Sequence, residues 1–193
     1  MSNKFLNSLE DLDSLNLSDF IKHSRRGIEK ENLRSNNSSI SLEPHPKVYG
    51  SSLTNSRITT DFSEALIELV TSPNKDLKSC LKELEDIVYF FFFYTNDDFW
   101  PASIPMSIED EYAIPIADYG NSNSGRLKKL YRVGLSQRYG SMMQTVSGIH
   151  YNFSFDDQLF EKWANREGET LRDFKDKKYL SLVRNFRRNA WLI

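Results

Sequence analysis

Hydrophobic and polar positions alternate in some segments of the chain and recur at helical spacing in others. The alternating segments predict strands over 27–34 and 148–155, with a shorter strand near 57–59. Helical spacing predicts helices at 5–21, in the segment that follows the short strand up to 72, at 77–94, from the loop at 119–126 through 139, and over most of 157–193. Separated strands and helices of this kind indicate an α+β fold. The length of 193 residues suffices for one ordinary domain.

The strand at 148–155 carries two unlike rows of side chains, because alternate residues of a strand point to opposite faces. One row is apolar and suits a packed core: Ile149, Tyr151, Phe153 and Phe155. The other row is polar but uncharged: His150, Asn152 and Ser154. A solvent face in a chain with 27% charged residues is expected to carry Lys, Glu or Asp. The sequence therefore predicts that the polar row faces a ligand cavity.

The composition narrows the possible partners. The 25 Lys and Arg nearly balance the 27 Asp and Glu, so the formal charge of −2 gives no argument for a nucleic-acid or anionic-membrane partner. The N-terminal residues lack the pattern of a secretory signal, and the apolar run at 87–94 is too short for a membrane span and is expected to form one end of a buried helix. Cys80, the single cysteine, is expected to be a small buried residue, with a reactive thiol as the alternative. These features predict a soluble cytoplasmic protein.

The C-terminal segment carries an apolar stripe at helical spacing, formed by Leu180, Val183, Phe186, Ala190 and Trp191. The pattern stops without the Gly, Asn or Pro that commonly ends a helix. We expect a chain that stops short of its natural end. A docked C-terminal helix is the alternative.

Two glutamates, Glu29 and Glu31, stand two residues apart in the first predicted strand and so share a face. Like charges side by side are unfavourable without a counter-ion, and a divalent cation would supply one. The alternative is a solvated edge, where Lys30 and Arg34 screen the repulsion.

A second acidic group lies in "TTDFSEALIELVTS". On a helix, Asp61 and Glu68 would lie within about 20° of each other, with Glu64 adjacent. The alternative is an ordinary capping-box pair of Asp61 and Glu64, but that leaves Glu68 unexplained. His150 could complete a metal site, although a strand histidine is more often simply hydrogen-bonded. Carboxylates and one imidazole favour Mg²⁺ or Mn²⁺.

Five blocks of sequence, in this order between residues 25 and 155, resemble one family: "RRGIEKENLR", "SSLTNSRITTDFSEALIELVT", "WPASIPMSI", "ADYGNSNSGRLKKLYRVGL" and "QRYGSMMQTVSGIHYNFSF". They are similar to the proteobacterial type of glutamate–cysteine ligase, with a weaker continuation at "RNFRRNAWLI". The resemblance implies a glutamine-synthetase-like catalytic fold, in which an antiparallel sheet with helices on the outside forms a funnel. Residues 1–193 would be the N-terminal part of that single domain, incomplete at the C-terminus.

The resemblance also implies roles for individual residues. The implied metal ligands are Glu29, Glu31, Asp61, Glu68 and His150. The implied substrate contacts are Phe62, Tyr131, Arg132 and Gln144, and Asn152 is implied to contact the nucleotide. The apolar row of the strand at 148–155 would then pack on helices, while its polar row faces the funnel.

The activity that the resemblance implies is the ATP-dependent joining of L-glutamate to L-cysteine, giving γ-glutamylcysteine in the first step of glutathione biosynthesis. Phosphorylation of the glutamate side chain would precede attack by the cysteine amine, with Mg²⁺ or Mn²⁺ neutralising the phosphate charge. Lys30 departs from the arginine expected in the family, and further ligands expected downstream lie beyond this sequence. The chain alone is therefore expected to lack a closed active site. The alternatives are a truncated, non-catalytic homologue that binds metal, nucleotide or a partner chain, and a related ligase that uses another amine.

Overall fold

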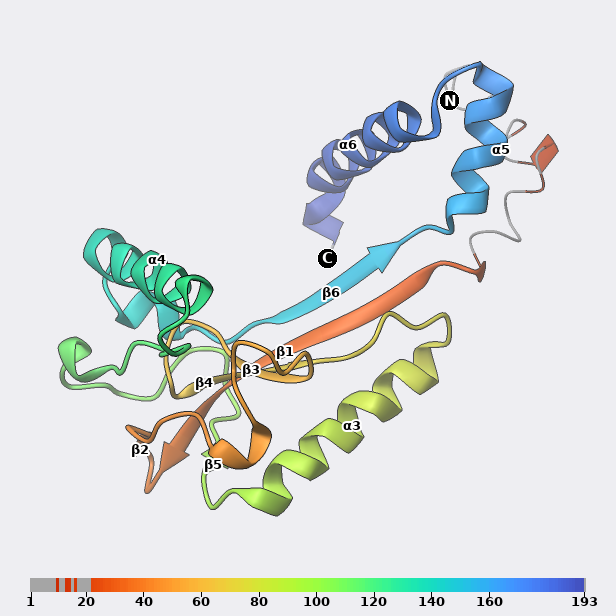
Figure 1. Cartoon of the computed structure of the whole chain (residues 1–193). Coiled ribbons are helices and arrows are strands. Elements are labelled where there is room, and N and C mark those ends of the chain that lie inside the picture. The colour runs from red at the N-terminus through yellow and green to blue at the C-terminus, as the bar shows by residue number, and fades with distance from the viewer. Residues whose placement is uncertain (1–9, 11–12, 15, 17–21, 193) are drawn as a thin grey trace. The chain divides into compact units, whose positions relative to one another are not determined.

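The computed structural model describes residues 10, 13–14, 16 and 22–192 (Figure 1). The helix predicted at 5–21 falls largely outside the described residues. The chain forms two compact units, one of residues 26–152 and the other of residues 1–25 and 153–193. The assignment of 1–193 to a single catalytic domain stays a prediction.

The sheet of the 26–152 unit is organised around its longest strand, β1 (Arg25–Asn36). β1 pairs antiparallel with β4 (Leu66–Val70), and β4 pairs antiparallel with β3 (Ile58–Thr60). β2 (Ser39–Ile40) and β5 (Asp98–Phe99) pair antiparallel with the end of β1, and β6 (Ile149–Ser154) also pairs with β1. The α+β fold with an antiparallel sheet, expected from the sequence, is confirmed.

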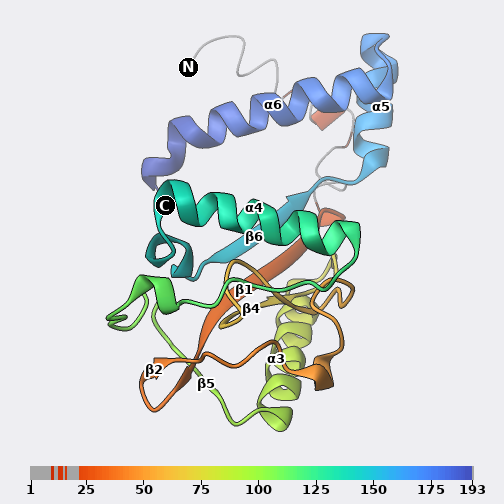
Figure 2. The ribbon, with the colours of Figure 1, turned by 60° about the vertical axis from the view of Figure 1, so that its left-hand side comes forward.

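Helices cover the two sides of this sheet (Figures 1 and 2). On one side, Ile87 and Phe91 of α3 (Leu77–Tyr94) pack with the buried Ile58, Ile67 and Leu69. On the other side, a second core gathers around Leu33 and Leu66, and Leu135 of α4 (Asn123–Tyr139) packs against it. Because alternate residues of β4 point to opposite faces, its run of apolar residues serves both cores.

Local sequence signals begin and end these elements. Asp76 caps α3 by accepting a hydrogen bond from the Ser79 N–H (2.7 Å), and Ser122 caps α4 in the same way. Gly140 ends α4 with a φ of 80°, a conformation that other residues rarely adopt. Short 3-10 helices occupy Lys47–Tyr49, Glu111–Ala113 and Met142–Thr145.

The described elements of the unit of 1–25 and 153–193 include the helices α5 (Asp157–Glu167) and α6 (Leu171–Asn189) and a 3-10 turn at Ala190–Leu192. They pack through Phe160, Ala164 and Phe174. The predicted apolar stripe lies on α6, where Leu180, Val183 and Phe186 are exposed. None of the described helices is both long and apolar enough to span a membrane.

The helix predicted between the short strand and residue 72 is wrong, because this segment forms a turn and the strand β4. The Leu66 N–H donates to the Ser63 carbonyl (2.9 Å), which closes the turn between β3 and β4. Ladders with β1 and β3 then satisfy the backbone of Leu66–Val70. The run "LIELV" is buried on both faces, and such a run cannot be assigned to helix or strand by periodicity alone.

Two expectations about aromatic residues also fail. The apolar row of β6 does not pack as expected, since Ile149 is 68% and Tyr151 is 56% exposed. At the end of α3, Phe91 is fully buried, but Phe93 is 79% exposed. One face of α3 lies against the sheet, so its consecutive aromatics cannot all be covered. Cys80 is buried, as predicted.

Candidate metal and substrate site

An acidic surface lies across two neighbouring strands. Glu29 and Glu31 share one face of β1, and the antiparallel register places Glu68 of β4 directly opposite Glu31. Burial is the largest of the effects that raise the pKa of Glu68 to about 7, and the Asp61, Glu29 and Glu31 carboxylates raise it further. Two of the predicted ligands therefore meet through strand register, not through a helical face.

The polar row of β6 faces these glutamates from the other edge of β1. His150 Nδ1 lies 3.3 Å from Glu29 Oε2 and 3.8 Å from Glu31 Oε1. Asn152 Nδ2 donates to Glu29 Oε1 (2.6 Å), and the Gly148 N–H donates to Glu31 Oε2 (2.7 Å). This arrangement accounts for two of the polar, uncharged residues of β6, because the side chains of His150 and Asn152 both contact the Glu29 carboxylate.

Asp61 approaches the same surface from the turn after β3. Its carboxylate Oδ1 lies 3.3 Å from Nη2 of Arg132, which comes from α4. Arg132 Nε also donates to the Asp61 carbonyl (2.5 Å). The Arg132 side chain is 12% exposed and that of Asp61 is 45% exposed, so the pair lies at the border between core and solvent.

The donor set fits a hard divalent cation, because Mg²⁺ and Mn²⁺ prefer carboxylate oxygens and accept an imidazole. The carboxylates of Asp61, Glu29 and Glu31 add to the effect of burial on the pKa of Glu68, and a cation bound here would offset this repulsion. Within the described part of the chain, however, no three His, Cys, Asp or Glu side chains are gathered into a formed metal site. The Glu29 carboxylate is instead held by Asn152 of β6, and that of Glu31 by the N–H of Gly148, the residue before β6.

The other predicted contact residues are placed differently. Phe62 is 2% exposed and belongs to the core around Leu33, so its side chain is not presented to a substrate. Tyr131 is 63% exposed on α4, and Gln144 is half-buried in the 3-10 helix Met142–Thr145. Asn152 is exposed and contacts Glu29. The structure thus brings His150 and Asn152 to Glu29 and sets Glu68 opposite Glu31. It pairs Asp61 with Arg132 and leaves Phe62 in the interior.

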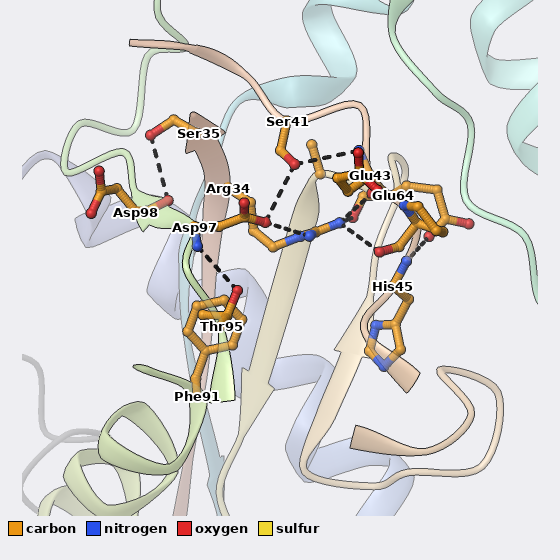
Figure 3. A network of polar contacts seen from close by, with 12 residues as sticks. Arg34, Ser35, Ser41, Glu43, His45, Glu64, Phe91, Thr95, Asp97 and Asp98 are labelled. Atoms are coloured by element: carbon orange, nitrogen blue, oxygen red, sulfur yellow. Dashed lines mark hydrogen bonds and ion pairs between the residues drawn. The ribbon is translucent and has the colours of Figure 1, made fainter. Parts of the chain in front are cut away.

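A buried polar network that the sequence reasoning missed lies on the same unit (Figure 3). At its centre Arg34 is 1% exposed and Glu64 is 7% exposed. Glu64 had been grouped with Asp61 and Glu68 on a helical stripe, whereas its carboxylate accepts from the backbone N–H groups of His45 and Asp118. An acid in a segment that is otherwise buried was the available signal.

Comparison with known proteins identifies one family of ligases. A family model described as glutamate-cysteine ligase matches residues 9–193. The glutamate–cysteine ligase of Saccharophagus degradans is 47% identical over 173 residues, and that of Pseudomonas paraeruginosa is 46% identical over 171 residues. These matches cover 87% and 86% of this chain but 32% of each relative, so the chain spans about a third of the length of the curated relatives.

Solved structures agree with this result. A glutamate–cysteine ligase from Francisella tularensis, in complex with AMP, superposes with a TM-score of 0.80 at 39% identity, covering 88% of this chain and 34% of that one. A bifunctional glutathione synthetase from Pasteurella multocida gives a TM-score of 0.82 at 30% identity, covering 93% of this chain and 24% of that one. Since the family model matches nearly the whole sequence and the fold agrees, the chain belongs to the glutamate–cysteine ligase family.

Proposed function

We propose that this chain supplies the N-terminal part of the active site of an ATP-dependent ligase that joins L-glutamate to L-cysteine. Membership of the family supports the reaction class. The observation that carries the proposal is the acidic surface of Glu29, Glu31 and Glu68, faced by His150. Such a surface suits a reaction in which phosphate charge must be neutralised by a cation. We propose a cytoplasmic setting, because the reaction consumes ATP and a reduced thiol.

In the proposed reaction, the glutamate side-chain carboxylate takes the γ-phosphoryl group of ATP and releases ADP. The cysteine amine then attacks the γ-glutamyl phosphate, and phosphate leaves as the amide forms. A bound Mg²⁺ or Mn²⁺ would neutralise charge on the phosphates. The residues that would hold it are Glu29, Glu31 and Glu68, with Asp61 and His150 beside them.

Neighbouring side chains orient these acids and add a positive charge beside them. Asn152 and His150 orient the Glu29 carboxylate through contacts of 2.6 Å and 3.3 Å. Arg132, nearly buried, presents a cation beside Asp61, and we propose that it contacts a carboxylate or phosphate of a substrate. A nucleotide at Asn152 is consistent with the AMP in the Francisella tularensis relative.

A chimeric ligase tests this proposal. In it, the 173 aligned residues of the Saccharophagus degradans relative are replaced by the matching residues of this chain. We expect ADP release that requires glutamate, cysteine and Mg²⁺ together. Competition among amino acids in this assay separates cysteine from another amine.

Glu29→Gln and Glu31→Gln should each lower kcat of the chimeric ligase by about 100-fold or more. The matched control is Glu85→Gln, since this residue is 64% exposed on α3. Near-normal turnover of Glu29→Gln across Mg²⁺ concentrations would refute the metal assignment.

The carboxylates of Glu29 and Glu31 already accept hydrogen bonds from Asn152 and from the Gly148 N–H, which favours a second candidate function, a non-catalytic homologue that binds metal or nucleotide. It predicts that the 193-residue chain binds Mg²⁺ and AMP in calorimetric titrations and that the chimeric ligase stays inactive although folded. Turnover by the chimeric ligase rejects this candidate. Absence of both binding and turnover rejects both functions.

A further inference from the structure

Glu64 is a buried carboxylate whose polar atoms are all engaged. Its N–H donates to the Pro115 carbonyl (2.9 Å), and its own carbonyl accepts from Arg34 Nη2 (2.9 Å). Its carboxylate accepts two backbone N–H groups, from His45 at Oε2 and from Asp118 at Oε1, both at 2.6 Å. Glu64 therefore joins two segments of chain that are far from each other in sequence.

The guanidinium of Arg34 hydrogen-bonds other acceptors than this carboxylate (Figure 3). Its Nη1 pairs with Asp97 Oδ2 (2.5 Å), and its Nη2 donates to the carbonyls of Glu43 (2.5 Å) and Glu64. The hydrogen bonds to the Glu64 carboxylate thus come from two backbone N–H groups. A buried charge is costly, and an apolar side chain would often stabilise a core better. The geometry that the carboxylate imposes is therefore its distinguishing contribution.

Tyr119, the residue after Asp118, connects the Glu64 contacts with the candidate site. Tyr119 is 4% exposed, and its hydroxyl donates to the carbonyls of Thr60 (2.6 Å) and Asp61 (2.9 Å). The Arg132 guanidinium carbon lies 4.7 Å from the centre of the Tyr119 ring. Arg132 itself holds both the carbonyl and the carboxylate of Asp61. One series of contacts thus runs from Glu64 through Tyr119 to the Asp61–Arg132 pair.

We propose that Glu64 is a positioning residue, which sets the Asp61–Arg132 pair by holding the backbone of Asp118 and thereby the side chain of Tyr119. The catalytic consequence rests on the proposed function, in which this pair contacts substrate and metal. The placement of the Asp61–Arg132 pair does not depend on the proposed function, and it can be measured on the 193-residue chain alone.

Glu64→Gln is the sharpest perturbation, because it keeps the shape of the side chain while removing its charge and changing its hydrogen-bonding pattern. A carboxylate accepts at both oxygens, whereas an amide accepts at one atom and donates at the other. In the variant, one of the two backbone N–H groups, of His45 or of Asp118, must face a donor. That segment has to move or lose its hydrogen bond.

The readout is the side-chain Nε–H resonance of Arg132 in ¹H–¹⁵N spectra of the chain, identified by its loss in Arg132→Lys. This N–H donates to the Asp61 carbonyl, so it reports the pair directly. In Glu64→Gln we expect the resonance to move and its exchange with solvent to quicken by about tenfold.

Glu83→Gln is the matched control. Its carboxylate oxygens also accept a backbone N–H, that of Ser72 at 3.0 Å, and pair with Arg57, but it lies on α3, on the opposite side of the sheet from α4. A folded Glu64→Gln chain with an unchanged Arg132 resonance overturns the proposal, and so does an equal change in Glu83→Gln. If Glu64→Gln does not fold, Tyr119→Phe breaks the series one step nearer the pair, and an unchanged resonance there overturns the proposal.

Kinetics of the chimeric ligase test the catalytic consequence. We expect Glu64→Gln to raise KM for an amino-acid substrate by about threefold to tenfold, with kcat changing less. Glu83→Gln should leave both parameters unchanged. An inactive chimera would speak against the proposed function alone, because the Arg132 resonance is measured without turnover. A moved resonance with unchanged kinetics would remove Glu64 from the catalytic argument.

Discussion

Replacing Glu68 by Gln should stabilise the metal-free chain at pH 8 and have a much smaller effect at pH 5. Burial, and then the neighbouring carboxylates, raise the pKa of Glu68 in the folded chain from 4.5 to about 7. Below pH 4.5 Glu68 is protonated in both the folded and the unfolded chain, and it costs nothing. Between pH 4.5 and 7 the unfolded chain ionises first, so stability falls as the pH rises. Above pH 7 the full cost is present, and Gln removes it.

The magnitude follows from the same values. A difference of one in pKa corresponds to about 1.36 kcal/mol, so the change from 4.5 to about 7 sets an upper limit of about 3.4 kcal/mol. Glu68 is only half-buried, and solvent screening reduces the cost to about 1–2 kcal/mol. We therefore expect Glu68→Gln to raise the free energy of unfolding at pH 8 by about 1–2 kcal/mol relative to the unsubstituted chain.

Urea unfolding followed by circular dichroism, in EDTA at pH 5 and pH 8, measures this difference. The control Glu85→Gln, on the exposed side of α3, should show the same small effect at both pH values. A Glu68→Gln effect that is equal at the two pH values, or larger at pH 5, would refute the reasoning. At pH 7, saturating Mg²⁺ should displace protons from the unsubstituted chain and fewer from the Glu68→Gln variant.

Three further predictions concern stability and substrate contact. Gly125→Ala should lower the free energy of unfolding by about 1–3 kcal/mol, because a Cβ there would lie 2.5 and 2.7 Å from backbone carbonyl oxygens. A Cβ at Gly134 in the same helix meets no atom within 4 Å, so Gly134→Ala should raise the free energy of unfolding by about 0.5–1 kcal/mol. Equal urea midpoints for the two variants would contradict this prediction. Phe62→Ala should lower the free energy of unfolding measured in urea by about 3–5 kcal/mol, because the Phe62 side chain is buried. Tyr131 is exposed, so Tyr131→Ala should lower it by less than about 0.5 kcal/mol and should raise the KM for cysteine in the chimeric ligase. A changed KM in Phe62→Ala without loss of stability would return Phe62 to the substrate site. Burial lowers the pKa of His45 to about 4 in the folded chain, so the unfolded chain protonates first and stability is lost as the pH falls from 6.5 toward 4. His45→Gln should remove about 1 kcal/mol of the stability loss between pH 7 and pH 5. An unaltered pH profile of unfolding would show that His45 is not responsible for this loss.

Several elements could be predicted because their signals are local. The helix Leu77–Tyr94 has an apolar stripe at helical spacing and a capping Asp76, and its predicted and observed bounds agree. The strands β1 and β6 show alternation, and their bounds differ from the prediction by at most two residues at each end. The segment up to residue 72 was mispredicted, because its apolar run has no single period and its ladder partners lie elsewhere in the chain.

The amino-acid sequence by itself determined which chemistry the chain can offer: two glutamates on one strand face, a polar strand row with His150, and further acids in the next blocks. Their meeting was decided only by tertiary structure, because the register of β1 with β4 sets Glu31 opposite Glu68, and β6 brings His150 to Glu29. The same holds for Glu64, whose carboxylate points into the interior only because two distant segments present their N–H groups there. Residue type is a local property, whereas hydrogen-bond partners and burial depend on contacts across the whole unit.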